Sequence, residues 1–345
     1  MRCELIDSMG TDLTVVNAAR VSMDKESSYE SEATCPTDSN GGKIGPYNRL
    51  RKGDKKLLSY LARESHWTPY SHARETFTFL KSLMNVNLTE DYANSMVIEG
   101  TSSDLIKVRH SIWGWAALIR RHALSGDASE HVSKILNTLY PESWKAMGMG
   151  APDAVNRDAM VRHEPTKGEK DPRFIDITMR ETVPIFVARQ RFKHMVGFTY
   201  NEVSRRYVDD TPEFYEPKVW RSRPEGSIKQ GSGESAVFHC DDGYHGETGE
   251  PINYVYDDII SHCQFVYASM LKAGVAPEQA RMVLPQSMYT SYYVTGSLAA
   301  WARAYKQRID AHAQVEIQDL AKQWGDIIAP LFPESWAVLT GGSDA

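Results

Sequence analysis

Apolar positions recur along this chain with both helical and strand periods. A helical period runs through residues 252–272 and stops before Gly274, a residue type that often ends helices. A shorter helical pattern covers Leu57–Arg63. Apolar and polar residues alternate through Thr76–Leu80, which predicts a strand with one buried face. Residues 27–49 and 147–172 are rich in polar residues, Gly and Pro and are predicted as loops.

Polar side chains gather on a further predicted helix near the middle of the chain. Thr182 is expected to cap this helix, Pro184 to lie in its first turn, and Gly197 to end it. With about 100° between successive residues, one side of the helix is apolar and the other is polar. The apolar side contains Ile185, Ala188 and Phe192, and the polar side contains Gln190, Lys193 and His194. A polar face held by a buried one suits an anionic, planar ligand.

A group of basic residues extends from this helix into the segment that follows it. The group consists of Arg189, Arg191, Lys193, His194, Arg205 and Arg206. A basic amphipathic helix is commonly a solvated surface or a contact for nucleic acid. However, Glu202 lies within the group, and a protein that binds phosphate backbones gains nothing from an acid among its arginines. Arginines beside Glu and Gln suggest a nucleotide site, in which the arginines bind phosphate.

Three short motifs follow one another in this segment. They are Arg189-Gln190, Lys193-His194-Met195 and Asn201-Glu202-Val203-Ser204-Arg205-Arg206-Tyr207. They resemble the signature of the flavin-dependent thymidylate synthases, which reads Arg-Gln, Arg-His-Arg and Asn-Glu-x-Ser-x-Arg-Tyr. This chain departs from it at Lys193 and Met195, which replace arginines, and by one additional residue between His194 and Asn201. Lysine keeps the charge of arginine but lacks its planar donor group, and Met195 removes a charge.

Two further blocks carry the same resemblance. The segment His66-Trp67-Thr68-Pro69-Tyr70-Ser71-His72 is similar to the family's His-x-Thr-Pro-x-x-His. The segment Ala280-Arg281-Met282-Val283-Leu284-Pro285 is similar to its Ala-Arg-x-x-Leu-Pro, and Arg308 follows in register with a further family arginine. Because Thr68 precedes a proline, its backbone is expected to be extended.

Projection of the segment from Ser297 onward as a helix places four of its residues on one face. The group consists of Ser297, Trp301, Arg308 and His312. A buried arginine beside aromatic rings is costly unless it is paired. Arg308 is therefore expected to meet an anion or the polar edge of a base.

The resemblance implies reductive methylation of dUMP to dTMP, with methylenetetrahydrofolate as carbon donor and NADPH as reductant through FAD. Arg308 would stabilise negative charge on the pyrimidine without a covalent nucleophile, so it is the candidate catalytic residue. The other candidate dUMP ligands are Gln190, Glu202, Ser204, Arg205, Arg206 and Arg281. The candidate FAD ligands are Ser22, His66, Thr68, Lys193, His194, Asn201, Ser297 and Arg303. Ser297 and Ala299 stand where the family usually has Asn and Arg, and Arg303 would supply the missing charge.

The resemblance also implies an α+β fold with a core of helices and antiparallel sheet, and a homotetramer whose sites are shared between subunits. No Gly-x-Gly-x-x-Gly follows a predicted strand, so a Rossmann fold is not expected. Residues 1–345 are interpreted as a single domain with inserts at about 81–180 and 218–252.

The first insert contains a partial internal repeat. Ser111-Ile-Trp-Gly-Trp115 is similar to Ser297-Leu-Ala-Ala-Trp301, and Leu139-Tyr-Pro-Glu-Ser-Trp144 is similar to Leu331-Phe-Pro-Glu-Ser-Trp336. The alternative is a chance similarity between amphipathic helices, but near-identity over six residues favours duplication. His122 stands where the other copy has Arg308, which favours a scaffold over a second site.

Composition limits the classes of function. The 345 residues carry a net charge of −6, so a general affinity for nucleic acid is not implied. No apolar run approaches the roughly 18 residues of a membrane span, and no signal-peptide pattern is present. The four cysteines are not closely paired, which is typical of reduced thiols in a cytoplasmic protein. The His and Cys spacings match no zinc pattern, so no metal is expected.

Two alternatives remain open at this stage. The first is a related enzyme that transfers a hydroxymethyl group to C5 of a pyrimidine nucleotide, since the same nucleotide contacts would serve it. The second is a non-catalytic protein that binds nucleic acid through the basic helix. The mass of the product identifies the first, and steep salt dependence of DNA binding identifies the second.

Overall fold

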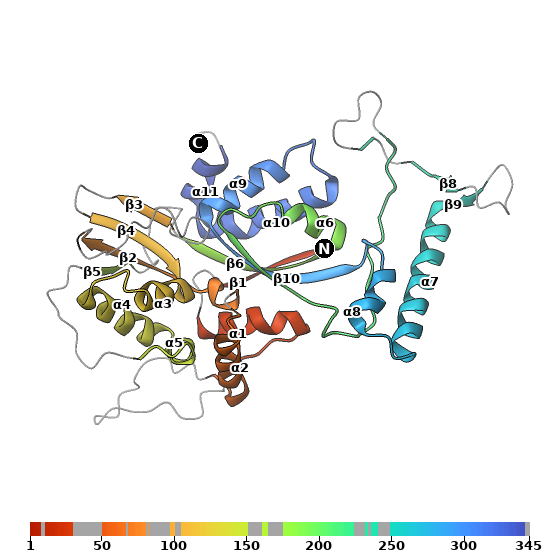
Figure 1. Cartoon of the computed structure of the whole chain (residues 1–345). Coiled ribbons are helices and arrows are strands. Elements are labelled where there is room, and N and C mark those ends of the chain that lie inside the picture. The colour runs from red at the N-terminus through yellow and green to blue at the C-terminus, as the bar shows by residue number, and fades with distance from the viewer. Residues whose placement is uncertain are drawn as a thin grey trace, which may run out of the picture.

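The structure is a computed structural model of the chain. It describes residues 1–7, 11–29, 50–66, 68–80, 82, 97–100, 105–150, 161–164, 175–223, 232–233, 236–240 and 249–341. Helices and antiparallel sheets build these parts (Figure 1), which confirms the predicted α+β class. Every strand pair in the described ranges is antiparallel, unlike the parallel sheet of a Rossmann fold.

A four-stranded sheet lies at the centre of the molecule. Its strands, in spatial order, are β1 (Arg2–Asp7), β6 (Asp176–Pro184), β10 (Tyr289–Ser297) and β7 (Phe198–Glu202). Strand β10 pairs with β6 along its whole length and with β7 on its other side. All residues of β10 after Tyr289 are buried, so this strand forms the middle of the core.

Four helices cover one face of this central sheet (Figure 1). They are α6 (Ile185–Arg191), α9 (Leu298–Arg308), α10 (Val315–Leu331) and α11 (Pro333–Thr340). Trp301 of α9 and Trp324 of α10 are fully buried, with ring centroids 5.5 Å apart. The indole Nε1 of Trp301 donates to the carbonyl oxygen of Ile177 at 3.2 Å, which attaches α9 to β6.

A second four-stranded sheet lies beside the first. Its strands, in spatial order, are β3 (Val97–Gly100), β4 (Leu105–Ser111), β2 (Arg74–Leu80) and β5 (Val161–Glu164). Helices α3 (Ile112–Arg120), α4 (Gly126–Leu139) and α5 (Pro141–Ala146) follow β4 in the chain. Helices α3 and α4 lie against this sheet (Figure 1), and α5 packs against α4. Strand β2 confirms the predicted strand at Thr76–Leu80, whereas β3, β4 and β5 were not predicted.

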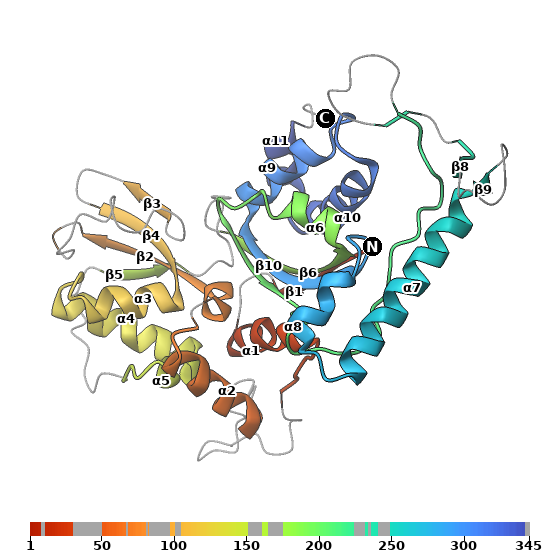
Figure 2. The ribbon, with the colours of Figure 1, turned by 45° about the vertical axis from the view of Figure 1, so that its right-hand side comes forward.

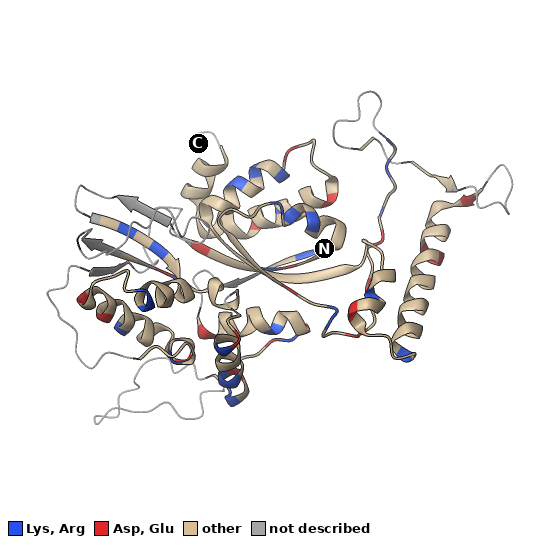
Figure 3. Cartoon of the chain, in the orientation of Figure 1, with Lys and Arg blue, Asp and Glu red and all other residues tan. Residues whose placement is uncertain are grey.

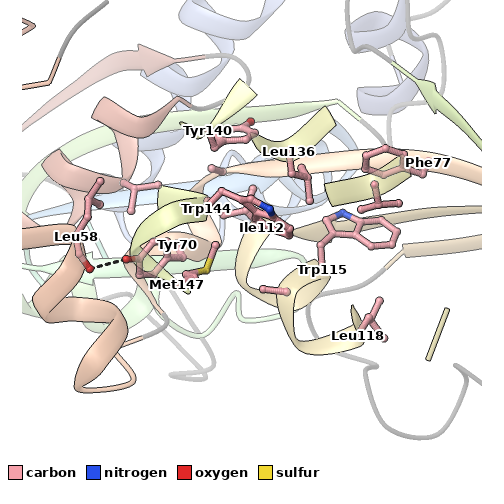
Figure 4. Packing of buried hydrophobic residues seen from close by; sticks show 14 of the residues in the cluster. Leu58, Tyr70, Phe77, Ile112, Trp115, Leu118, Leu136, Tyr140, Trp144 and Met147 are labelled. Atoms are coloured by element: carbon pink, nitrogen blue, oxygen red, sulfur yellow. Dashed lines mark hydrogen bonds between the residues drawn. The ribbon is translucent and has the colours of Figure 1, made fainter. Parts of the chain in front are cut away.

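The second sheet has a hydrophobic core of its own, shown in Figure 4. Trp115 and Phe77 meet edge to face with ring centroids 5.0 Å apart, and Trp144 is fully buried nearby. Helices α1 (Asp12–Arg20) and α2 (Lys52–Arg63) contribute to the same core. The hydroxyl of Tyr70 donates to the carbonyl oxygen of Leu58 at 2.7 Å, which holds α2 against it.

Helix α7 (Ile252–Lys272) has the bounds that the apolar period predicts. Gly274 follows it with φ of +88°, a conformation that favours glycine. The short helix α8 (Pro277–Ala280) comes next, and both lie at the edge of the molecule, away from the second sheet (Figure 2). Within α7 only Tyr267 is buried, while Tyr254 and Phe265 are 64% and 68% exposed.

Three predictions about the central helix are wrong. Thr182 does not cap α6, because it lies within β6 and its hydroxyl pairs with that of Ser291 at 3.2 Å. Pro184 ends β6 and precedes the helix instead of lying in its first turn. The helix stops at Arg191, well before Gly197, because the following amides bond in tighter turns such as His194 N to Arg191 O.

The prediction for Thr68 is also wrong. Its φ of −57° and ψ of −43° are right-handed instead of extended. The carbonyl oxygen of Thr68 accepts from the amide of Ser71 at 3.0 Å and so opens the short 3₁₀ turn Pro69–His72. This hydrogen bond outweighs the preference that a following proline imposes.

The two predicted loops are described only in part. Residues 30–49 lie outside the described residues, and the second predicted loop contains strand β5. Helix α2 begins at Lys52, five residues before the predicted start. No helix within the described ranges is long and apolar enough to cross a membrane, and no group of three or more metal-ligating side chains occurs there.

A buried ion pair lies at the centre of the first core. The guanidinium of Arg191 is fully buried, and its Nε lies 3.2 Å from both carboxylate oxygens of Glu181. Tyr292 donates to the same carboxylate at 2.5 Å, and Arg191 Nη1 donates to the hydroxyl of Tyr200 at 2.6 Å. The guanidinium also lies over the rings of Phe198, Trp301 and Trp324. The paired carboxylate keeps the pKa of Arg191 above its usual value despite burial.

Loss of one partner would leave an uncompensated charge in this core. We expect Arg191→Met to lower the free energy of unfolding by about 3–5 kcal/mol, and Arg191→Met with Glu181→Gln to recover much of it. Urea unfolding measures both. Arg189→Met, at an exposed position of the same helix, is the matched control. An equal loss in the single and double variants would contradict a charge-based explanation.

Candidate functional site

The end of helix α6 carries the first group of candidate side chains. Gly197, with φ of +82°, reverses the chain between α6 and β7, and a Cβ there would lie 2.9 Å from that of Ala300. This close approach brings the turn onto α9. The hydroxyl of Tyr200 donates to the carbonyl oxygen of His194 at 2.7 Å, which fixes the turn from the other side.

Arg308, the last residue of α9, joins this group. Its Nε donates to Nε2 of His194 at 2.8 Å, and its Nη2 donates to the carbonyl oxygen of Gln190 at 3.0 Å. Burial and the nearby guanidinium of Arg191 lower the pKa of His194 to about 4. The imidazole is therefore neutral near pH 7 and can accept the hydrogen bond from Arg308. Among the described residues, Nη1 of Arg308 has no partner.

A hollow opens beside this pair. Gln190 and Arg308 line it, together with Lys306, Gln307, Asp310, His312, Ala313 and Gln314. We refer to it as the Arg308 hollow. The prediction that Ser297 and His312 share one helical face is wrong. Ser297 caps the start of α9, and His312 lies beyond the end of this helix. The fully buried arginine beside aromatic rings is Arg191, and Arg308 is only half-buried.

A second hollow of about 630 Å³ lies at the far end of β7 and β10. We refer to it as the Glu202 hollow. The candidate residues Glu202, Ser204, Arg205 and Arg281 line it. The hydroxyl of Thr290 donates to Glu202 Oε1 at 2.7 Å. Although Glu202 is exposed as a residue, desolvation of its carboxylate raises its pKa, and Thr290 and Arg281 act against that effect.

The arginines at the rim of the Glu202 hollow form exposed ion pairs. Arg205 Nη1 lies 2.6 Å from Asp210 Oδ1, and Arg206 Nε lies 3.1 Å from Glu278 Oε2. Arg281 is exposed and donates to the carbonyl oxygen of Glu278 at 3.3 Å. Figure 3 shows such basic residues on α6 and α9 as well as near α8. Two separate basic clusters therefore occur on one chain, and the linings of the two hollows share no residue.

The candidate flavin residues are spread over both sheets. Ser22 lies beside Ser204, whose amide donates to its carbonyl oxygen at 3.0 Å, so it belongs with the Glu202 hollow. Lys193 and Arg303 are exposed beside the turn after α6, and Arg303 donates to the carbonyl oxygen of Val196. The hydroxyl of Ser297 accepts from the amide of Ala300 as the cap of α9.

The heptapeptide candidates belong to the second sheet's side of the molecule. His66 is exposed, with its ring edge-on to Tyr60 at 6.0 Å between centroids, and Thr68 is half-buried. Asn201 lies on β7 and pairs through Oδ1 with Nε2 of His72 at 3.4 Å. The structure thus connects the heptapeptide to Asn201 through His72, a residue that the sequence did not single out as a site residue.

Comparison with known proteins identifies the family. The family model described as thymidylate synthase complementing protein matches residues 127–334, a range that includes Gln190, Glu202, Arg281 and Arg308. The chain belongs to this family. The matched range leaves out Ser22, His66 and Thr68, which rest on the resemblance alone.

Individual members of the thymidylate synthase complementing family are similar to this chain over different lengths. A flavin-dependent thymidylate synthase of Thermus thermophilus is 32% identical over 185 residues, which cover 54% of this chain and 63% of that relative. This chain thus spans less than two thirds of the length of that relative. Another from Aquifex aeolicus is 27% identical over 342 residues, with 91% and 93% covered. Among solved structures, a UMP/dUMP methylase PolB from Streptomyces cacaoi has a TM-score of 0.43 and 18% identity, over 99% of this chain and 94% of that one.

The lowered pKa of His194 has a measurable consequence in this family member. An unfolded histidine has a pKa of about 6.5, so the unfolded chain takes up a proton first as the pH falls. We expect the stability due to neutral His194 to be complete above about pH 6.5 and to be lost progressively as the pH falls toward about 4. The His194 ring signal in NMR spectra should not titrate between about pH 8 and pH 5. His194→Gln assigns that signal, and a titration midpoint near 6.5 would contradict the arrangement.

Proposed function

We propose that this protein is a flavin-dependent thymidylate synthase that converts dUMP to dTMP. The observation that carries the proposal is Arg308, held by neutral His194 and the backbone of Gln190 so that the rest of its guanidinium faces a hollow. A guanidinium fixed at the pyrimidine edge stabilises negative charge and enriches C5 in electrons. The names of the similar proteins from Thermus thermophilus and Aquifex aeolicus support the same reaction.

The side chains of the two hollows suit the parts of dUMP. Arg281, Arg206 and Arg205, with the hydroxyl of Ser204, would bind the phosphate, because guanidinium groups pair with phosphate oxygens in two-pronged hydrogen bonds. Gln190 and Glu202 would position the base or the ribose. Glu202 with its raised pKa has a greater tendency to keep a proton and donate a hydrogen bond than an ordinary carboxylate.

The residues present also suit FAD as the cofactor. Lys193 and Arg303 provide exposed cations beside one turn, as a pyrophosphate requires, and Asn201 and Thr68 provide uncharged polar groups. Ser22, His66, His194 and Ser297 complete the proposed set, although the hydroxyl of Ser297 already caps α9. When bound and reduced by NADPH, FAD would supply the hydride that completes the methyl group, with methylenetetrahydrofolate as carbon donor. We propose a cytoplasmic location for this chemistry.

We further infer that several copies of the chain assemble, as the homotetramer that the resemblance implies. The two hollows share no lining residue, and we infer that a complete dUMP site combines the Arg308 hollow of one chain with the Glu202 hollow of another. The exposed apolar side chains of α7, such as Tyr254, Ile259 and Phe265, support self-association.

The reaction is tested by incubating the protein with dUMP, methylenetetrahydrofolate and NADPH, with and without FAD. We expect FAD-dependent dTMP, identified by its mass. We expect Arg308→Ala to reduce turnover at least about a hundredfold while the fold stays intact. Lys322→Ala, an exposed position on α10, is the control. Full activity of Arg308→Ala would refute the assignment. A hydroxymethylated nucleotide as the product would show that the protein transfers a hydroxymethyl group instead of a methyl group.

The sharing of sites is tested by mixing two inactive variants. We expect Arg308→Ala and Arg281→Ala each to be inactive, and activity to return when both are co-expressed, because mixed assemblies contain sites built from the two intact hollows. The variant that carries both changes in one chain should stay inactive with itself. If the mixture stays inactive while the two variants, each with a different affinity tag, purify together, both residues act within one chain.

A further inference from the structure

Two parts of the chain build the same succession of elements. Strands β2 and β4 pair so that Arg74 lies opposite Ser111, and strands β6 and β10 pair so that Asp176 lies opposite Ser297. In both parts the second strand leads directly into a helix, then into a longer helix, and then into a short helix that begins with proline. The structural order therefore follows the internal repeat in the sequence.

The agreement extends to individual hydrogen bonds. Ser111 and Ser297 each cap the following helix, by accepting from the amide three residues later at 3.1 Å. Trp115 Nε1 donates to the carbonyl oxygen of Glu75 at 3.0 Å, as that of Trp301 does to Ile177 at 3.2 Å. The residues before the short helices also agree, with φ and ψ of −131° and 58° at Tyr140 and −138° and 59° at Phe332.

We propose that residues 73–146 are a diverged copy of residues 175–340, and that this first copy holds the site strand β7 of the second copy in place. The proposal has three parts: the first copy lacks the groups of the candidate site, the two copies pair through equivalent positions, and the first copy contacts β7. Each part has its own observation.

The first copy lacks the buried ion pair of the second. By strand register, Phe79 and Ile106 lie opposite each other where the second copy pairs Glu181 with Tyr292. His122, exposed at the end of α3, occupies the position of Arg308. The polar groups that orient the turn after α6 and the Arg308 hollow are therefore missing from the first copy.

The copies meet at equivalent positions. Arg74 Nη1 lies 3.3 Å from Asp176 Oδ1, and these two residues occupy the same place in the two copies. Contact between equivalent positions is the pattern that a twofold relation produces, as in a symmetric dimer. Arg109 Nη1 donates to the same oxygen at 2.7 Å, and all three side chains are buried. Because one copy has Arg74 and the other has Asp176 at this position, the first copy pairs more favourably with the second copy than either would with another of its own kind.

Together with His72, the residue that directly precedes it, the first copy reaches the site strand through the same interface. His72 Nδ1 pairs with the hydroxyl of Thr295 at 2.7 Å, and its Nε2 pairs with Asn201 Oδ1 at 3.4 Å. Arg74 Nη2 donates to the hydroxyl of Thr199 at 2.9 Å. Burial, aided by the charge of Arg74, lowers the pKa of His72 to about 3, so the ring is neutral here. Asn201 and Thr199 lie on β7, so these bonds set the position of the strand that leads to Glu202.

The inference about β7 rests on the proposed function only in taking Asn201 as a flavin ligand. It is tested by titrating the flavin-free protein with FAD and following flavin fluorescence. We expect His72→Phe to weaken FAD binding about tenfold, the cost of one or two lost hydrogen bonds. Binding of dUMP, followed by calorimetry, should change much less. His72→Gln, which keeps a donor near Asn201, should recover part of the FAD affinity.

A matched control is His110→Phe, which replaces a buried histidine within the first copy, one whose Nδ1 accepts from the amide of Ser111. It should lower the midpoint of thermal unfolding and leave FAD affinity unchanged. Equal FAD affinity in His72→Phe and wild type would overturn the positioning role. A wild-type protein that binds no FAD would instead refute the proposed function.

The pairing of the copies has a test that needs no ligand. Arg109→Met and Asp176→Asn, singly and together in the full chain, form a double-mutant cycle in thermal unfolding. We expect the shift of the double variant to be clearly smaller than the sum of the single shifts, since each single change leaves a buried charge unpaired. Additive shifts would overturn the proposed interface.

Discussion

The fold around the candidate site depends on the burial of one positive charge. The guanidinium of Arg191 lies 4.3 Å from the ring centroid of Phe198 and 4.7 Å from that of Trp324. A charge in such surroundings is tolerated only when an acid and further hydrogen bonds compensate it. Glu181 on β6 provides the acid, and Tyr200 on β7 provides a further partner. Strands β6 and β7 and helices α6, α9 and α10 must therefore all be in place together.

This requirement explains why the Arg308 hollow has a defined shape before any ligand binds. Tyr200 contacts both Arg191 and the carbonyl oxygen of His194, so the position of the buried charge is passed to the turn after α6. His194 in turn orients Arg308. A group that is oriented in advance loses little entropy when it meets its ligand. The Glu202 hollow differs, because Arg205 and Arg206 there are bonded to acids at its rim.

The sequence predicted those elements whose period is unbroken, such as helix α7 and strand β2. It also contains the adjacent motif residues Arg189-Gln190 and Asn201-Glu202, which lie within the range that the family model matches. The role of the heptapeptide at His66 stays a prediction. Strand β4 was missed, because its Arg109 and His110 suggest an exposed segment, although they are 2% and 3% exposed. The partner that permits the burial of Arg109 is Asp176, which lies 67 residues further along the chain. A local sequence pattern cannot show a pair of residues so far apart. For the same reason, the sequence did not predict that Arg191 is a buried and paired charge.

The exposed ion pairs at the Glu202 hollow have a consequence for how an anion enters it. Asp210 and Glu278 neutralise Arg205 and Arg206, so the two arginines do not repel each other strongly. An exposed pair such as Arg206 with Glu278 contributes only about 0–1 kcal/mol, which is a small loss when it breaks. A phosphate dianion carries more negative charge than the carboxylate that it would displace. A ligand that binds through a carboxylate would form the same kind of ion pair as the acid it replaces, with no gain. With Arg205 and Arg206 in their proposed role as phosphate ligands, the rim acids would be exchangeable partners that discriminate against weakly charged ligands.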